Sequence, residues 1–511
     1  MRYIAVLALA GIAVAGSENI PTDSWIYDAL DLLKTSSFIH SMPSTSRPWT
    51  RSEAAALVAE ADSASRFGKT GLAQMAALQR LRTEFRNELP DLHCKVGPRR
   101  PLLSIRVPGA ENRYARADFF SRTGLSQDRQ SLSIGTVFSN RPADKFCLYE
   151  RIELTGFHPD SFGVIDSSGH HLYGKRVNPW QDLAIFEMEL AYLSFKIPWL
   201  RLEIGRDGFS FGPGYVSSVM LSDNAPSLDH IQLCASYKNF KFLSFTSYLS
   251  RWGAKHRFLS TQRAELSLWN RVTLGGAMMN VYSWDSLQTT DLAGMMNPLL
   301  PIYFSVANSD HGDNFLVGWD AVVYLPRVKV YGQLFLDNYE FIKRENPPCN
   351  AFAWQVGGFW APNLGPETRF EYARINPFTY YHRVYHIMYE NYEIPLGHEL
   401  GPDADELYAS IGFNPFVQLK LSLIGTYTRR GYYNRGDFER KSWHGGEPLP
   451  GQFPAGEVDR TVRLGPEVYW RPFRDLSITG SVKYWQSGNY QGVPEDDQSG
   501  LDLSLYLEYR Y

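Results

Sequence analysis

The sequence predicts an all-β transmembrane barrel of about 18 antiparallel strands, preceded by a small α-helical N-terminal module. Polar and apolar residues alternate along most of residues 113–511, which is the pattern of strands with one apolar face. Aromatic residues make up 14% of the chain, yet its mean hydropathy is slightly polar, at −0.30. This combination is typical of a transmembrane barrel, because only every second strand residue meets lipid and aromatic girdles mark both membrane interfaces.

Residues 1–16 are predicted to be a cleaved secretory signal peptide. Arg2 supplies a positive start, and an apolar run follows from Ile4 to Val14. The run is too short to cross a bilayer, which takes ~20 apolar residues. Small residues then place the cleavage near Ala15 or Gly16, so we expect export and insertion into the outer membrane of a bacterial cell. The alternative is a buried N-terminal helix.

Residues 20–92 are predicted to form the helical module, because Ala, Leu, Glu and Arg dominate there and few segments alternate. Asp23 is placed to cap a helix that begins at Trp25. Thr50 and Glu53 have the spacing of a capping box, in which two side chains satisfy the free backbone amides at a helix start. A further helix is expected between Thr70 and Glu88, where apolar residues recur at helical spacing.

Residues 113–511 are predicted to form the barrel. Apolar residues occupy every second position in runs such as 417–423 and 476–484. Some connections between such runs are very short and others are long, which is the pattern of outer-membrane barrels. The last strand also alternates, and its final residue, Tyr511, resembles the terminal aromatic residue by which bacterial outer-membrane barrels are recognised for insertion.

Charge and repeat pattern argue against other classes of protein. Lys plus Arg number 51 and Asp plus Glu 54, so the net charge is only −3, and we expect no nucleic-acid partner. A soluble β-sandwich or propeller would also alternate. However, the chain shows no blade-like repeat of about 40 to 50 residues, and several alternating runs are as long as a tilted membrane strand requires.

Ordered motifs add a resemblance to a known family. They include Gly205-Arg206-Asp207, then Leu221 to Pro226, then Glu371 to Tyr380, then Pro395 to Glu406. In this order they resemble the Wzi capsule-assembly family of outer-membrane proteins, and the similarity is spread over nearly the whole chain after residue 20. The resemblance implies a barrel with helices near its periplasmic end. It also implies a non-catalytic protein that holds capsular polysaccharide at the cell surface.

Two functions are therefore expected. The first is binding or anchoring of surface or capsular polysaccharide in support of capsule assembly, with outer-membrane lipid as the second partner and a monomeric barrel. The alternative is a porin-like outer-membrane channel for a polar solute, which ion conductance in a bilayer would distinguish.

Catalytic and metal sites are not expected. Asp310-His311-Gly312-Asp313 lacks further converging ligands, and Ser222 with His230 is not accompanied by a nucleophile elbow. No cofactor is expected.

Candidate site residues fall into two sets. Sugars stack on aromatic rings and bond to polar side chains, so Tyr432, Tyr433 and Trp443, in an expected long loop, are candidates for glycan binding. Charged residues in strand-like segments are expected to face the lumen and to form a network that is mainly structural. They are Arg201, Glu203, Arg206, Glu371 and Arg374.

Overall fold

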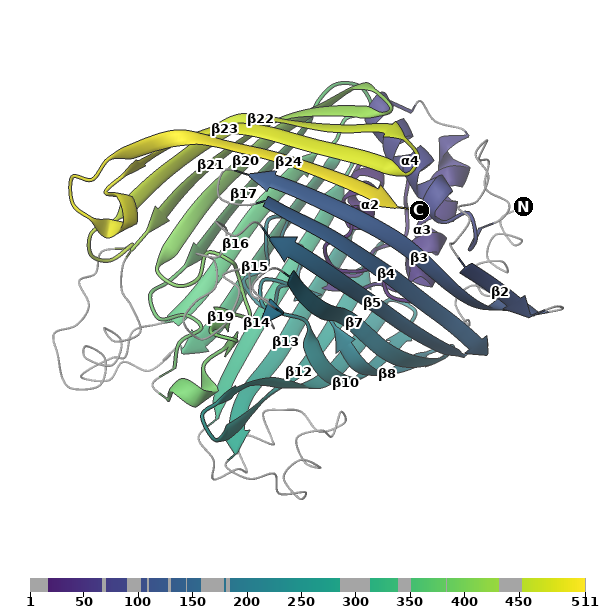
Figure 1. Cartoon of the computed structure of the whole chain (residues 1–511), viewed down its shortest axis with the longest axis horizontal. Helices are drawn as coiled ribbons and strands as arrows, with labels where there is room; N and C mark the ends of the chain where they lie inside the picture. The colour runs from purple at the N-terminus through teal and green to yellow at the C-terminus, as the bar shows by residue number, and fades with distance from the viewer. Residues whose placement is uncertain are drawn as a thin grey trace.

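The computed structural model describes residues 17–66, 70–89, 103–107, 110–126, 130–143, 145–157, 179–180, 184–284, 313–338, 351–382, 384–431 and 453–510. Within these residues the chain forms a closed barrel of 18 antiparallel strands with three helices, as the sequence predicts (Figure 1). The last strand pairs with the first along Ser504–Arg510 and Phe120–Ser126, which closes the sheet. Closure matters because lipid cannot satisfy the backbone groups of an open strand edge.

The barrel strands follow one another around the wall in chain order. They are β3 (Ala110–Ser126), β4 (Gln130–Ala143), β5 (Phe146–Phe157), β7 (Ala184–Ile197), β8 (Leu200–Asp207), β10 (Leu228–Tyr237), β11 (Phe240–Trp252), β12 (Lys255–Leu268), β13 (Val272–Trp284), β14 (Asn314–Leu325), β15 (Val328–Asn338), β16 (Ala351–Trp360), β17 (Glu367–Ile375), β20 (Ala404–Phe416), β21 (Leu419–Arg430), β22 (Asp459–Phe473), β23 (Leu476–Gly488) and β24 (Gln498–Arg510). The short β2 (Leu103–Val107) and β6 (Pro179–Trp180) extend this sheet beside β3 and β7.

The two faces of the wall differ in polarity, as the alternation predicts. In β8, Leu202 and Ile204 are 42% and 54% exposed on the outside, whereas Arg201 and Glu203 are buried inside. In β21, Leu421 and Leu423 face outward in the same way. The outer surface is therefore an apolar belt suited to lipid.

The two ends of the barrel are also different. The helices and the C-terminus lie at one end, which we call the module end, and the opposite end is the loop end (Figure 1). The connections at the module end are short, and large apolar residues beside them are exposed. These residues are Trp199, Tyr237, Trp269, Trp360, Phe416 and Phe473. They form the aromatic girdle expected at a membrane interface.

The helical module contains α2 (Trp25–Thr35), α3 (Arg51–Ser65) and α4 (Leu72–Glu84), which pack around a common apolar core. The predicted capping box of Thr50 and Glu53 is present at the start of α3. The predicted cap of α2 is wrong by one residue. Ser24, not Asp23, accepts a hydrogen bond from the Ile26 amide, because the helix begins at Trp25 and only the residue just before it is placed to cap. No described helix is long and apolar enough to cross a membrane.

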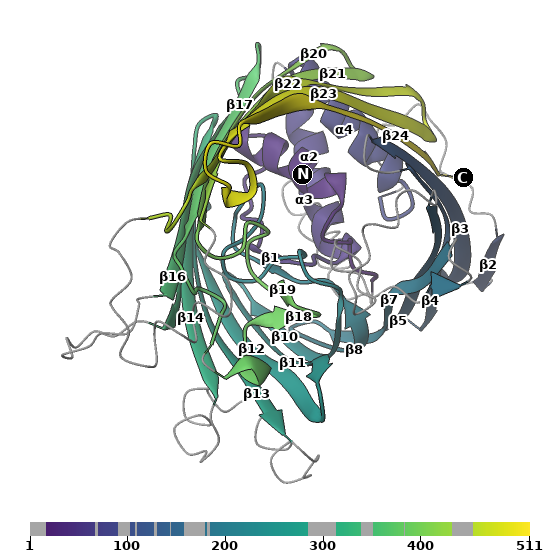
Figure 2. The same cartoon turned by 60° about the vertical axis from the view of Figure 1, so that its left-hand side comes forward.

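The module sits within the ring of strands at the module end (Figure 2). On α2, Asp31 forms ion pairs with Lys329 at 3.1 Å and Arg369 at 3.4 Å. Burial raises the pKa of Asp31, but the two cations outweigh it and hold the pKa below its ordinary value. Gln74 on α4 donates to the Pro362 carbonyl in the turn between β16 and β17. These contacts attach the module to the wall around β14–β17.

Two inner loops fill part of the lumen. The first inner loop, residues 208–227, contains β9 (Ser210–Phe211), which pairs with β1 (Ser46–Arg47) of the N-terminal region. The second inner loop, residues 376–403, contains η2 (Tyr385–Ile387), β18 (Glu390–Asn391) and β19 (Ile394–Pro395).

The two inner loops pack on each other. The Tyr380 hydroxyl donates to the Val219 carbonyl, and the backbone amide of Ser222 donates to the Leu396 carbonyl. With inward residues of β11–β17 they form the main apolar core.

Candidate functional site

Arg201 and Glu203 belong to a buried network that binds the start of the described chain to the wall. Asn19 donates to Glu203 at 3.0 Å and to Asp207 at 2.7 Å, and Arg201 donates back to the Asn19 side chain. His230 completes the network, with its Nε2 3.1 Å from Glu203. The inward charges of this wall are thus satisfied by the N-terminal segment and by one another, which is a structural role.

Glu371 holds the first inner loop in the lumen. Its carboxylate accepts hydrogen bonds from the backbone amides of Tyr215 at 2.7 Å and Val216 at 2.9 Å. The Tyr331 hydroxyl donates to the same carboxylate. Two loop amides that would otherwise be unsatisfied inside the barrel therefore find a charged acceptor.

Arg206 and Arg374 depart from the expectation that they face the lumen. Arg206 lies on the outer face and pairs with Asp229 at 2.7 Å, with both side chains substantially exposed. Arg374 is also on the outer face, where its guanidinium lies 3.7 Å from the ring of Phe453. The reason is the two-residue period: Arg201, Glu203 and Glu371 occupy odd positions that face inward, whereas Arg206 and Arg374 occupy even ones.

Electrostatic attraction also places the module against the wall. Glu53, the capping residue of α3, faces cations from three strands: Lys241, Lys196 and Arg201. Partial loss of hydration inside the barrel raises the pKa of Glu53, but these cations outweigh it and lower the pKa to about 2. The sequence predicts Glu53 only as a capping residue, because the wall cations are close to it only after the barrel has closed around the module.

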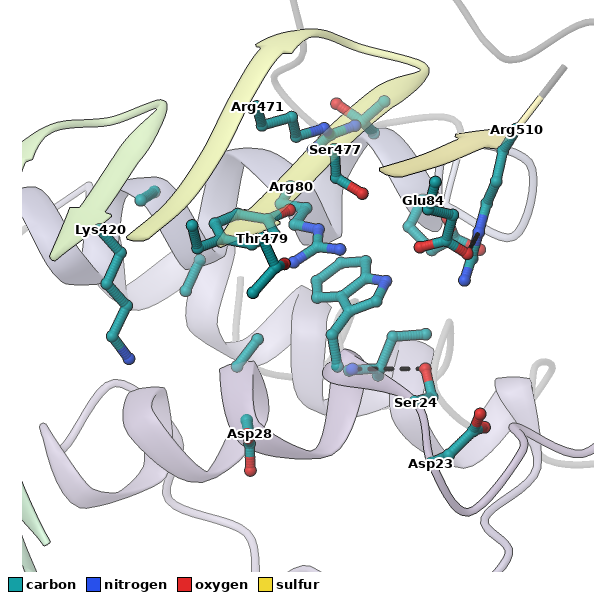
Figure 3. Close-up of a pocket in the computed structure, with 18 of the residues that line it drawn as sticks. Asp23, Ser24, Asp28, Arg80, Glu84, Lys420, Arg471, Ser477, Thr479 and Arg510 are labelled. Carbon is teal, nitrogen blue, oxygen red and sulfur yellow. Dashed lines mark hydrogen bonds and ion pairs between the residues drawn. The ribbon is translucent and has the colours of Figure 1, made fainter. Parts of the chain in front are cut away.

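A cavity of about 1230 Å³ remains in the lumen between the module and the wall strands β20–β24 and β3–β5. Figure 3 shows the part of its lining that the module and the C-terminal strands supply. Both signs of charge line it, and many are paired. Lys420 pairs with Glu367, and Arg510 pairs with Glu508 at 2.7 Å. Such a chamber has the volume and polarity to hold a small polar solute.

The predicted glycan-binding residues Tyr432, Tyr433 and Trp443 lie outside the described residues. Two other aromatic pairs are present at the loop end. Trp485 and Tyr490 stack with ring centroids 5.8 Å apart, and Trp252 stacks with Tyr385 at 6.0 Å.

Neither pair is predicted from the sequence, because each brings together rings from separate elements. For Trp485 and Tyr490 a signal existed, since the turn residues Gly488 and Asn489 stand between them.

Comparisons with known proteins agree with this geometry. The family model described as "Capsule assembly protein Wzi" matches residues 143–500. Among solved structures, the Wzi protein of Escherichia coli is 15% identical, with a TM-score of 0.62, covering 96% of this chain and 99% of its own. It is described as an outer membrane protein involved in group 1 capsule assembly and a carbohydrate-binding β-barrel.

Two Pseudomonas aeruginosa barrels are less similar. OprD is 10% identical, with a TM-score of 0.44, covering 78% of this chain and 95% of its own. OccK8 (OprE) is 9% identical, with a TM-score of 0.45, covering 78% and 98%. A comparison with curated proteins found no match.

Proposed function

The chain belongs to the Wzi family of capsule assembly proteins, and on that premise we propose that it binds or anchors surface polysaccharide, capsular polysaccharide included, without cleaving it. The observation that carries the proposal is the family match over residues 143–500, on a barrel of the same fold as a protein described as carbohydrate-binding. This function assists capsule assembly by holding polymer at the cell surface.

The proposed location is the bacterial outer membrane, with the loop end outside the cell and the module end in the periplasm. The apolar belt and the girdle at the module end support contact with outer-membrane lipid. We propose that residues 1–16 are removed on export, that residues 20–92 act as a periplasmic module on the barrel of residues 113–511, and that the protein is a monomer. A single chain closes this barrel through β24 and β3.

Polymer binding at the loop end has a physical rationale in its aromatic pairs. Trp485 and Tyr490 present a stacked pair next to the polar side chains of Asn489 and Asp459, which suits the apolar faces and the hydroxyls of a sugar. Each such contact is weak, so affinity for a repeating polymer arises by avidity. We propose that Tyr432, Tyr433 and Trp443 add to this surface.

The side chains that resemble hydrolase parts have structural partners instead. The Ser222 hydroxyl donates to the Gly397 carbonyl in the second inner loop, while His230 bonds to Glu203 in the wall. Neither contact forms the nucleophile and base pair that a hydrolase needs. This supports a binding protein.

The test is retention of surface glycan from the source organism by the purified protein. Replacement of Tyr432, Tyr433 and Trp443 together by Ala is expected to reduce retention of long polymer more than binding of a short oligomer, with the barrel intact. Tyr237→Ala, an exposed aromatic residue at the module end, is the matched control and is expected to behave as wild type. If the wild-type protein binds no glycan but conducts ions in a bilayer, the porin-like channel function replaces this proposal.

A further inference from the structure

Arg80 on α4 projects into the lumen cavity and is held there by aromatic rings (Figure 3). Its guanidinium carbon lies 3.6 Å from the centroid of Trp25, the first residue of α2, and 5.1 Å from that of Tyr469 on β22. Contact with ring faces stabilises the cation and fixes its position. Stacking on ring faces leaves the in-plane N–H donors of the guanidinium available for an acceptor.

Arg80 differs from its neighbours in its partners. Arg82 on the same helix pairs with Asp62 at 2.6 Å, and Arg510 pairs with Glu508. Among the described residues, no carboxylate forms an ion pair with Arg80. Burial, with repulsion from Arg471 and Arg510, lowers the pKa of Arg80 to about 10 although Tyr469 and Glu508 oppose the shift, so the side chain stays protonated at neutral pH.

Arg80 is thus an enclosed cation that has no direct ion-pair partner among the described residues, so a bound anion would stabilise it. Removing a charge from bulk water is unfavourable unless a partner of opposite charge replaces the lost hydration. The Tyr469 hydroxyl also has no hydrogen-bond partner among the described residues. Ser477 and Thr479 line the same side of the cavity and offer further hydroxyl donors (Figure 3).

The cavity extends to the module end. Its lining includes Gln418 and Arg474, which lie in the short turns between β20 and β21 and between β22 and β23. At its inner end it reaches Tyr215 of the first inner loop. We propose that this chamber is a binding site for an oxyanion, a carboxylate or phosphate group on a small solute from the periplasmic side, with Arg80 as its principal ligand.

This site is separate from the polysaccharide surface at the loop end, so either proposal can fail without the other. Calorimetric titration of the purified full-length protein in detergent, at low ionic strength, compares glucuronate, inorganic phosphate and neutral glucose. We expect an anion to bind and glucose not to bind. Arg80→Gln is expected to weaken anion binding by about tenfold or more, because a charge-assisted hydrogen bond is lost. Arg66→Gln removes an exposed charge of the module outside the cavity and is expected to bind as wild type.

Each outcome bears on the proposal. Binding of glucuronate alone assigns the site to a sugar acid, and binding of both anions assigns it to the oxyanion group itself. Failure of wild type to bind either anion, equal binding of glucose, or wild-type affinity in Arg80→Gln would overturn it. Arg80→Lys keeps the charge but loses the planar set of guanidinium donors, and it controls for a folding defect in Arg80→Gln. It is expected to have intermediate affinity, and wild-type affinity in that variant also counts against the site.

Discussion

Asn19 donates a hydrogen bond to Glu203 at 3.0 Å, although 184 residues separate them in the chain. Both side chains are buried, and the backbone amide of Asn19 also donates to the Tyr192 hydroxyl at 2.6 Å. The start of the described chain is thus fastened to β7 and β8 inside the barrel. The module is held by the wall as well as by its own core.

Replacement of Asn19 by Ala is expected to loosen this attachment. Glu203 and Asp207 each lose a buried donor, which costs about 1–3 kcal/mol for a group left unsatisfied. Trypsin should then cleave the region around Lys34 and Arg51 faster than in wild type. Asn87→Ala, an exposed change on the same module, is the control, and equal cleavage rates in the two variants would contradict the anchoring role.

Replacement of Glu371 by Ala is expected to release the first inner loop. The Tyr215 and Val216 amides lose their acceptor, so hydrogen exchange at these two positions should rise about tenfold or more, as expected when a charge-assisted hydrogen bond is lost. Thr368→Ala changes an outward position of the same strand and serves as the control. Unchanged exchange in the Glu371 variant would show that the apolar core alone holds the loop.

The second inner loop is expected to respond to pH through His398. Burial lowers the pKa of His398 to about 3, whereas a solvated histidine takes up its proton near 6.5. The loop therefore loses stability as the pH falls from 6.5 towards 3, because only the released state binds the proton. Hydrogen exchange of residues 376–403, corrected for intrinsic rates, is the measurement. In His398→Asn the loosening at pH 5 relative to pH 7.5 should be smaller.

Asp403 in the same loop acts in the opposite direction. Burial raises its pKa from 3.8 to about 6, so the loop gains stability as the pH falls from 6 towards 3.8. Asp403→Asn keeps an acceptor for the Ala455 amide and suits the positive φ of 56° at this position. It is expected to make the loosening of the loop at pH 5 larger than in wild type. A change of the opposite sign would refute the assignment.

Deletion of Tyr511, or its replacement by Asp, is expected to impair insertion of the barrel into the outer membrane. Tyr511 lies outside the described residues; by the alternation of the sequence it is expected to follow Leu505 and Tyr509, which are exposed on the outward face of β24. The same strand must pair with β3 to close the barrel. Heat-modifiable migration of membrane-extracted protein measures assembly, and a normal pattern from either variant would argue against the role.

Local patterns in the sequence were sufficient to predict the two faces of the barrel wall and one helix cap. Alternation in runs such as 417–423 predicts which face each residue takes, because successive strand side chains point to opposite sides. The capping box of Thr50 and Glu53 depends on residues three apart, so it too is visible locally. The same alternation places Arg206 and Arg374 on the outer face, once Arg201 and Glu371 are known to face inward in their strands.

Only the tertiary structure decided what occupies the lumen. The partners of Glu203 and Glu371 come from the N-terminal segment and from the first inner loop. Arg80 meets Tyr469 only because the module enters a closed barrel. Such contacts join residues more than 150 positions apart, and no periodicity encodes them. Alternation is a local property of the backbone, whereas the filling of the lumen depends on how separate segments satisfy one another's buried polar groups after the sheet has closed.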